Sequence, residues 1–216
     1  MSTPHLLNIA LHVLAGTIAM VIGCYQLGNA KGGDAHRRWG WRFCYAGFVV
    51  CASAAAGLMA FRFLPNFAVL TVLVLYQLVG GWRSARTRER GPQAADAAWT
   101  IATVAVTAWL APVVLRAGGN VLVYSSLGAL ATVIAYDAAR WCFPRRWFGA
   151  LWRYDHSYKL IASLFGMLSA LVGNVVRFGQ PWSQILPSAL GLATVAFFFV
   201  RLYRQDAARR AARPSA

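Results

Sequence analysis

The apolar positions of this chain form long runs, and short polar connections separate the runs at regular intervals. A run of 18 or more apolar residues with few charges can cross the roughly 30 Å hydrocarbon core of a bilayer as a helix. The pattern predicts seven such spans, over residues 4–26, 41–61, 65–82, 95–115, 119–139, 157–178 and 182–202. Barrel strands would alternate polar and apolar residues, and a run such as 102–110 does not. The expected fold is all-α, a polytopic membrane protein with seven transmembrane helices.

The boundaries of these spans predict the organisation of the chain. Residues 1–205 are expected to form a single seven-helix transmembrane domain, followed by a basic cytoplasmic tail over 206–216. Before span six, Trp147, Phe148, Leu151 and Trp152 share one helical face next to several arginines. This arrangement is typical of a short helix lying in the membrane interface, with Pro144 near its start.

The composition agrees with a membrane protein. The chain is 59% hydrophobic and only 12% charged, whereas soluble domains average about 25% charged residues. Its 21 Lys and Arg against 6 Asp and Glu give a net charge of +15. In a soluble protein this excess would indicate nucleic-acid binding, but in an apolar chain it indicates basic loops. The expected partners are the lipid bilayer and its anionic phospholipid headgroups, with no nucleic acid; a membrane protein partner or a homo-oligomer stays open.

The distribution of the basic residues predicts an orientation. The six connections and the C-terminal tail carry 4, 1, 4, 1, 5, 1 and 5 Lys or Arg residues in turn. The positive-inside rule places the rich connections and the C-terminus in the cytoplasm and the N-terminus outside. The expected location is the cytoplasmic (inner) membrane of a bacterium.

Polar residues within apolar spans need a reason, because burying them in a membrane is costly. In span one, small and polar residues share a narrow helical arc: Asn8, His12, Gly16, Ala19, Gly23 and Gln26. Either this stripe is a packing seam with satisfied hydrogen bonds, or His12 and Asn8 bind a ligand, a metal or a proton. Span six carries a similar stripe from His156 to Arg177, so we expect spans one and six to face inward.

A second group of candidates lies at the cytoplasmic ends of spans one, two, five and six. Two histidines, carboxylates and basic residues could converge there on a metal, a cofactor or an anionic substrate: His36, Arg37, Asp137, Asp155, His156 and Lys159. His36 and His156 are the candidate metal ligands. Alternatively, the carboxylates pair with arginines and cap helices, with Asp155 as the N-cap of span six.

These residues favour a cofactor-, metal- or small-ligand-binding membrane protein of redox type, with haem, a quinone or a divalent metal as candidate cofactors. Haem held by two histidines needs imidazoles from separate helices, which His36 and His156 would supply. The alternatives are a small-molecule or ion transporter, a metal-dependent hydrolase, and a structural or regulatory subunit without catalysis. Whether the protein is an enzyme stays open.

Two segments resemble a known family. His12 and Gly16 form a His-x3-Gly pattern, Gly23 follows in the same span, and the next connection reads Lys31-Gly-Gly-Asp-Ala-His36-Arg37-Arg-Trp-Gly40. This combination resembles a bacterial family of predicted multi-pass membrane proteins known only as a domain of unknown function, and the resemblance covers about residues 5–90. His156 is matched more loosely. The resemblance implies several spans but no activity.

Overall fold

The computed structural model describes residues 2–118, 120–176 and 178–211, and the regular structure within these ranges is helical. The α-helices are α1 (Thr3–Gly28), α2 (Asp34–Ala60), α3 (Pro65–Thr87), α4 (Ala94–Arg116), α5 (Val121–Ala139), α6 (Phe148–Val175) and α7 (Trp182–Ala211). Single turns of 3-10 helix are η1 (Arg88–Arg90), η2 (Arg140–Cys142) and η3 (Arg145–Trp147).

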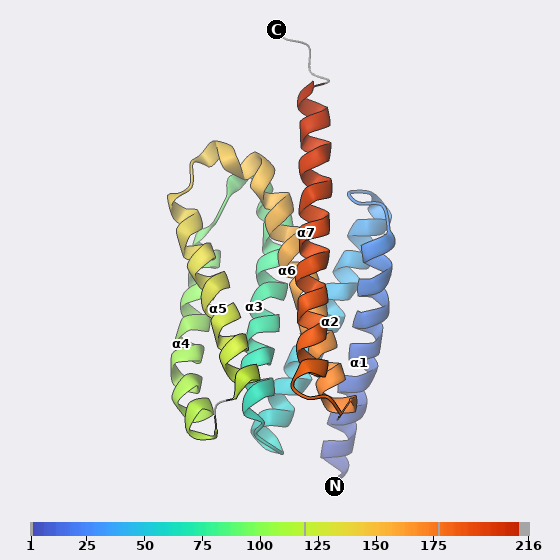
Figure 1. The fold of residues 1–216 in the computed structure, drawn as a ribbon, viewed down its shortest axis with the longest axis vertical. Coiled ribbons are helices and arrows are strands. Elements are labelled where there is room, and N and C mark those ends of the chain that lie inside the picture. Colours follow the sequence, from blue (N-terminus) through green and yellow to red (C-terminus); the bar gives the residue numbers. More distant parts are fainter. Residues whose placement is uncertain (1, 119, 177, 212–216) are drawn as a thin grey trace.

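Within the described residues, seven α-helices are each long and apolar enough to cross a membrane, so the prediction of an all-α fold with seven such helices is confirmed. They run up and down beside one another, so that the N-terminus and the C-terminus lie at opposite ends of the bundle (Figure 1). The α1–α2, α3–α4 and α5–α6 connections lie at the same end as the C-terminal part of α7 (Figure 1). We call this end, where the sequence concentrates its Lys and Arg residues, the basic end.

Helix α3 lies at the centre of the bundle, packed along α6 and against α2, α4 and α5. Glycines allow the two central helices to approach closely. A Cβ atom added to Gly81 of α3 would lie 2.8 Å from Leu160 of α6, and one added to Gly166 of α6 would lie 2.7 Å from Val74 of α3. The expectation that spans one and six face inward therefore holds for α6, whereas α1 packs mainly on α2 and leaves the centre to α3.

Side chains at two helix starts bond the backbone N–H groups that have no partner within the helix. Asn120 Oδ1 accepts hydrogen bonds of 3.1 Å from the N–H groups of Leu122 and Val123 at the start of α5. At the start of α4, Gln93 and Asp96 form a reciprocal capping box. These caps fix the ends of the α3–α4 and α4–α5 connections.

Helix α6 begins nine residues before the predicted span six. The prediction of a separate interfacial helix before that span is therefore wrong. Residues 150–158 contain neither proline nor glycine, so the helix that starts at Phe148 continues unbroken into the span. The Phe148 side chain is buried rather than directed at lipid. Asp155 consequently lies two turns inside α6, so the prediction that it is the N-cap of span six is wrong.

The remaining boundaries also extend beyond the apolar runs. Helix α2 begins at Asp34 rather than near residue 41, so His36 lies in its first turn. Helix α7 continues past the boundary expected after residue 205 as far as Ala211. Arg177, and residues 212–216 of the predicted basic tail, lie outside the described residues.

Candidate functional site

The residues proposed from the sequence fall into three separate groups. The first lies in a buried ion network between α3, α5 and α6: Asp137, Asp155 and Lys159. The second lines an open groove at the basic end: His36, Arg37 and His156. The third lies between α1 and α2: Asn8 and His12. The histidines and carboxylates therefore do not converge on one point.

The ion network contains two cations and two carboxylates, so it is formally neutral. Lys159 Nζ lies 2.6 Å from Asp137 Oδ1 and 3.3 Å from Asp155 Oδ1. Arg140 Nη1 lies 2.9 Å from Asp155 Oδ2 and 3.3 Å from Asp137 Oδ1. The side chains of Lys159 and Asp155 are at most 1% exposed, so water barely screens these contacts. Buried charges are tolerated when they are paired and hydrogen-bonded in this way.

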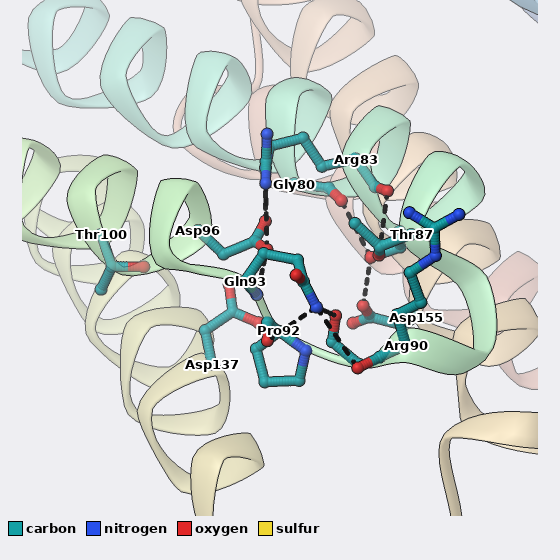
Figure 2. A network of polar contacts seen from close by, with 12 residues as sticks. Gly80, Arg83, Thr87, Arg90, Pro92, Gln93, Asp96, Thr100, Asp137 and Asp155 are labelled. Atoms are coloured by element: carbon teal, nitrogen blue, oxygen red, sulfur yellow. Dashed lines mark hydrogen bonds and ion pairs between the residues drawn. The ribbon is translucent and has the colours of Figure 1, made fainter. Parts of the chain in front are cut away.

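Neutral side chains extend the network to α3 and α4. Tyr76 Oη donates to Asp137 Oδ2 at 2.8 Å and lies 3.0 Å from Thr100 Oγ1, while Ser84 Oγ donates to Asp155. Figure 2 shows both carboxylates beside the α3–α4 connection. The neighbouring cavity has a volume of about 10 Å³, roughly enough for one water molecule. The network thus connects helices α3, α4, α5 and α6, and its cavity is too small for an organic ligand.

The groove is far larger, with a volume of about 1070 Å³, comparable with the largest small-molecule sites of proteins. Helices α1, α2, α3, α6 and α7 line it together with η1 and the α1–α2 connection. Spans three and seven therefore contribute where span five was expected. Part of its wall is apolar: Leu27, Phe43, Leu160, Ile161, Leu164 and Phe198.

Among the described residues, the charges lining the groove are strongly unbalanced, with seven cations against one acid, Glu89. Two of the cations form ion pairs, Arg37 with Asp34 and Arg153 with Asp206. Within the described part of the chain, the other five form no salt bridge: Lys31, Arg86, Arg88, Arg90 and Arg201. The groove is therefore an electropositive site with an apolar wall.

Aromatic rings hold some of these cations in place by cation–π contacts. The Arg86 guanidinium lies 5.1 Å from the ring centroid of Trp82 and 5.7 Å from that of Trp41. Arg88 lies 5.6 Å from the ring centroid of Trp152. Since an aromatic face does not neutralise a cation, these arginines keep their full charge for a ligand.

Lys31, in the α1–α2 connection, hydrogen-bonds the C-terminal end of α1 and also lines the groove. Its ammonium group donates to the carbonyl groups of Gln26, Leu27 and Asn29 at the end of α1, where a cation complements the helix dipole. Burial and, to a lesser extent, repulsion from Arg201 lower the pKa of Lys31 to about 8. The groove therefore loses the charge of Lys31 as the pH rises through about 8.

The two groove histidines have defined and opposite tautomers. The amide nitrogen of Gln26 donates to the carbonyl oxygen of His36 at 2.8 Å and lies 3.1 Å from His36 Nδ1. Because an amide nitrogen can only donate, Nδ1 accepts, and the neutral ring of His36 carries its proton on Nε2. His156 Nδ1 lies 2.9 Å from the carbonyl oxygen of Gly81 and must donate. The Nε2 atom of neutral His156 is therefore an acceptor.

His12 and Asn8 form the packing seam between α1 and α2. Ser53 Oγ already donates to backbone carbonyl groups of its own helix, so it accepts from His12 Nδ1 at 2.9 Å. Asn8 Nδ2 donates to the backbone oxygen of Ser53 at 3.1 Å. The two residues predicted to bind a ligand, a metal or a proton each form a hydrogen bond with Ser53, as the packing interpretation expects.

The geometry gives no support to a metal centre. Among the described residues, no three His, Cys, Asp or Glu side chains come together as a metal site. His36 and His156 are neighbours, but Asp137 and Asp155 are committed to Lys159 and Arg140. Haem, quinone and divalent metal therefore stay predictions.

Several residues of the ion network are not among the site residues predicted from the sequence. Arg140 lies three residues after Asp137, a spacing that brings helical side chains together. Tyr76 and Ser84 are eight residues apart with Gly80 midway, a four-residue spacing that places polar and small positions on one face of α3. This spacing is the sequence feature that indicates a polar face on α3.

Comparisons with protein-family models, curated proteins and solved structures find no match for this chain. The resemblance to a bacterial membrane-protein family therefore stays a prediction.

Proposed function

We propose that this chain is an integral membrane protein that binds an amphipathic anion in the groove at its basic end. The observation that carries the proposal is the groove itself, which combines five cations lacking an acidic partner with an apolar wall. A phosphate or carboxylate would bind the cations, and a hydrocarbon portion would contact the wall. This deepens the small-ligand interpretation of the sequence and needs no cofactor.

The position of the groove supports a membrane lipid as the source of this anion. Connections rich in Lys and Arg lie at the cytoplasmic headgroup level in membrane proteins. We infer the same orientation here, with the N-terminus outside and the basic end in the cytoplasm of a bacterium. Reporter fusions to the C-terminus test this orientation: green fluorescent protein should fluoresce and alkaline phosphatase should be inactive, and the reverse result contradicts it.

Native mass spectrometry of the full chain, released from detergent micelles with defined lipids, tests the proposed ligand. Phosphatidylglycerol should bind more tightly than zwitterionic phosphatidylcholine, and soluble glycerol 3-phosphate should compete poorly because it lacks the apolar part. Equal binding of phosphatidylglycerol and phosphatidylcholine would refute the proposal, and efficient competition by glycerol 3-phosphate would refute its amphipathic part.

Two substitutions localise the binding. Arg86→Gln and Arg201→Gln each remove a groove cation, and since one basic residue contributes about 1 kcal/mol to binding an anionic lipid surface, each should weaken binding roughly fivefold. Arg62→Gln removes an exposed arginine at the opposite end and is the matched control. Equal losses in all three variants would show that binding is not specific to the groove.

A further inference from the structure

The groove places two histidines with opposite hydrogen-bonding roles side by side. His36 presents an Nε2–H donor and His156 an Nε2 acceptor, because their Nδ1 atoms are held by Gln26 and by the carbonyl group of Gly81. Within the described residues neither Nε2 atom has a hydrogen-bond partner, and neither is among the buried unpartnered atoms. Both atoms are therefore open to a ligand in the groove.

The spacing of the two rings leaves room for one bridging atom. The ring centroids are 6.3 Å apart and the planes are nearly perpendicular, at 89°. An imidazole nitrogen lies only about 1.1 Å from its ring centre, so the two Nε2 atoms are too far apart for a direct hydrogen bond of about 3 Å. An oxygen about 2.8 Å from each nitrogen bridges Nε2 atoms up to about 5.6 Å apart, a separation that this ring spacing allows.

We infer that His36 and His156 bind a hydroxyl group of the ligand, so that the groove selects an acidic lipid with a hydroxylated headgroup. The inference rests on the proposed function, which supplies the anionic and apolar parts of the ligand. A hydroxyl oxygen accepts from His36 Nε2–H while its own proton is donated to His156 Nε2. A phosphate oxygen without a proton can only accept, and it would leave the His156 acceptor unsatisfied, at a cost in affinity.

The ligand comparison that tests this inference needs no variant. Phosphatidylglycerol and phosphatidylethanol carry the same single phosphodiester charge and can carry the same acyl chains, but only phosphatidylglycerol has headgroup hydroxyls. Two hydrogen bonds should make phosphatidylglycerol bind about tenfold more tightly to the full chain in native mass spectrometry. Equal binding of the two lipids, each tighter than phosphatidylcholine, would overturn the hydroxyl inference and leave the proposed function standing. If neither binds more tightly than phosphatidylcholine, both are overturned.

Variants then identify the atoms. His36→Phe and His156→Phe remove the donor and the acceptor in turn, and each should reduce the tenfold preference for phosphatidylglycerol to about threefold or less while leaving phosphatidylethanol binding unchanged. His12→Phe changes a histidine that is bonded to Ser53 outside the groove, and it should keep the full preference. A preference that survives both groove substitutions would overturn the assignment. A parallel loss of both lipids would also overturn it, because that pattern indicates a disturbed groove rather than a lost hydroxyl contact.

Discussion

Lys159→Met is the sharpest test of the ion network, because it removes one cation from a site that water hardly reaches. The Lys159 side chain is 1% exposed, and its ammonium group lies 2.6 Å from Asp137 and 3.3 Å from Asp155. Methionine fills a similar volume without charge, so two carboxylates would share the single cation of Arg140. Leaving a buried charge uncompensated typically costs about 3–5 kcal/mol, and we expect this loss in the free energy of unfolding.

The measurement is unfolding of the purified protein in mixed micelles with increasing sodium dodecyl sulfate, followed by far-ultraviolet circular dichroism. Arg37→Gln is the control, because the Arg37–Asp34 pair is largely exposed and such pairs contribute up to about 1 kcal/mol. Asp137→Asn added to Lys159→Met restores the charge balance and should recover part of the lost stability. A role of the ion network in stability is contradicted if Lys159→Met costs no more than the control, or if the two network substitutions add independently.

Three further predictions concern the helix crossing, the pH response and a cap. Gly81→Ala should lower the free energy of unfolding by about 1–3 kcal/mol because its Cβ would meet Leu160. Gly128→Ala, in open space on α5, should instead raise the free energy of unfolding by about 0.5–1 kcal/mol. Chemical unfolding of the two variants measures whether the free energy falls or rises. Lys31 has a pKa of about 8 and is charged below it, so phosphatidylglycerol binding should weaken as pH rises from 7 to 9, and Lys31→Arg should flatten this profile in a titration. Asn120→Ala should cost about 0.5–2 kcal/mol, since Asn120 caps α5; an unchanged unfolding curve would contradict that role.

The sequence alone predicts the number and kind of elements because a membrane span needs a long apolar run, whatever surrounds it. The ends of the helices are less predictable, because hydropathy locates the apolar part only. Asp34 and Phe148 start helices whose first turns are polar or interfacial, so the apolar runs begin several residues later than α2 and α6. Helical geometry continues through such turns, past Gly40 in α2 and Gly149 in α6, because neither extension contains a proline.

The candidate residues were found from the sequence, but their grouping was not. Asp155, His156 and Lys159 are neighbours in the chain, yet His156 lies in the groove and Asp155 joins Lys159 in the ion network. Which side of α6 faces which partner depends on its packing against α3, and hydropathy contains no information on that contact. The hydrogen bond from His156 to the carbonyl group of Gly81 is equally unpredictable from hydropathy, since it links residues 75 positions apart.

The charge of the groove follows from how the few acids of the chain are used. The sequence has only six, and five of them form ion pairs in the structure: Asp34, Asp96, Asp137, Asp155 and Asp206. Asp96, in the first turn of α4, pairs with Arg83, and Asp137 and Asp155 neutralise the cations of the buried network. The sixth, Glu89, is the single acid that lines the groove. Because five of the six acids form ion pairs elsewhere or with Arg37 and Arg153, five of the seven described cations around the groove lack an acidic partner, and an anionic ligand can supply the missing charge.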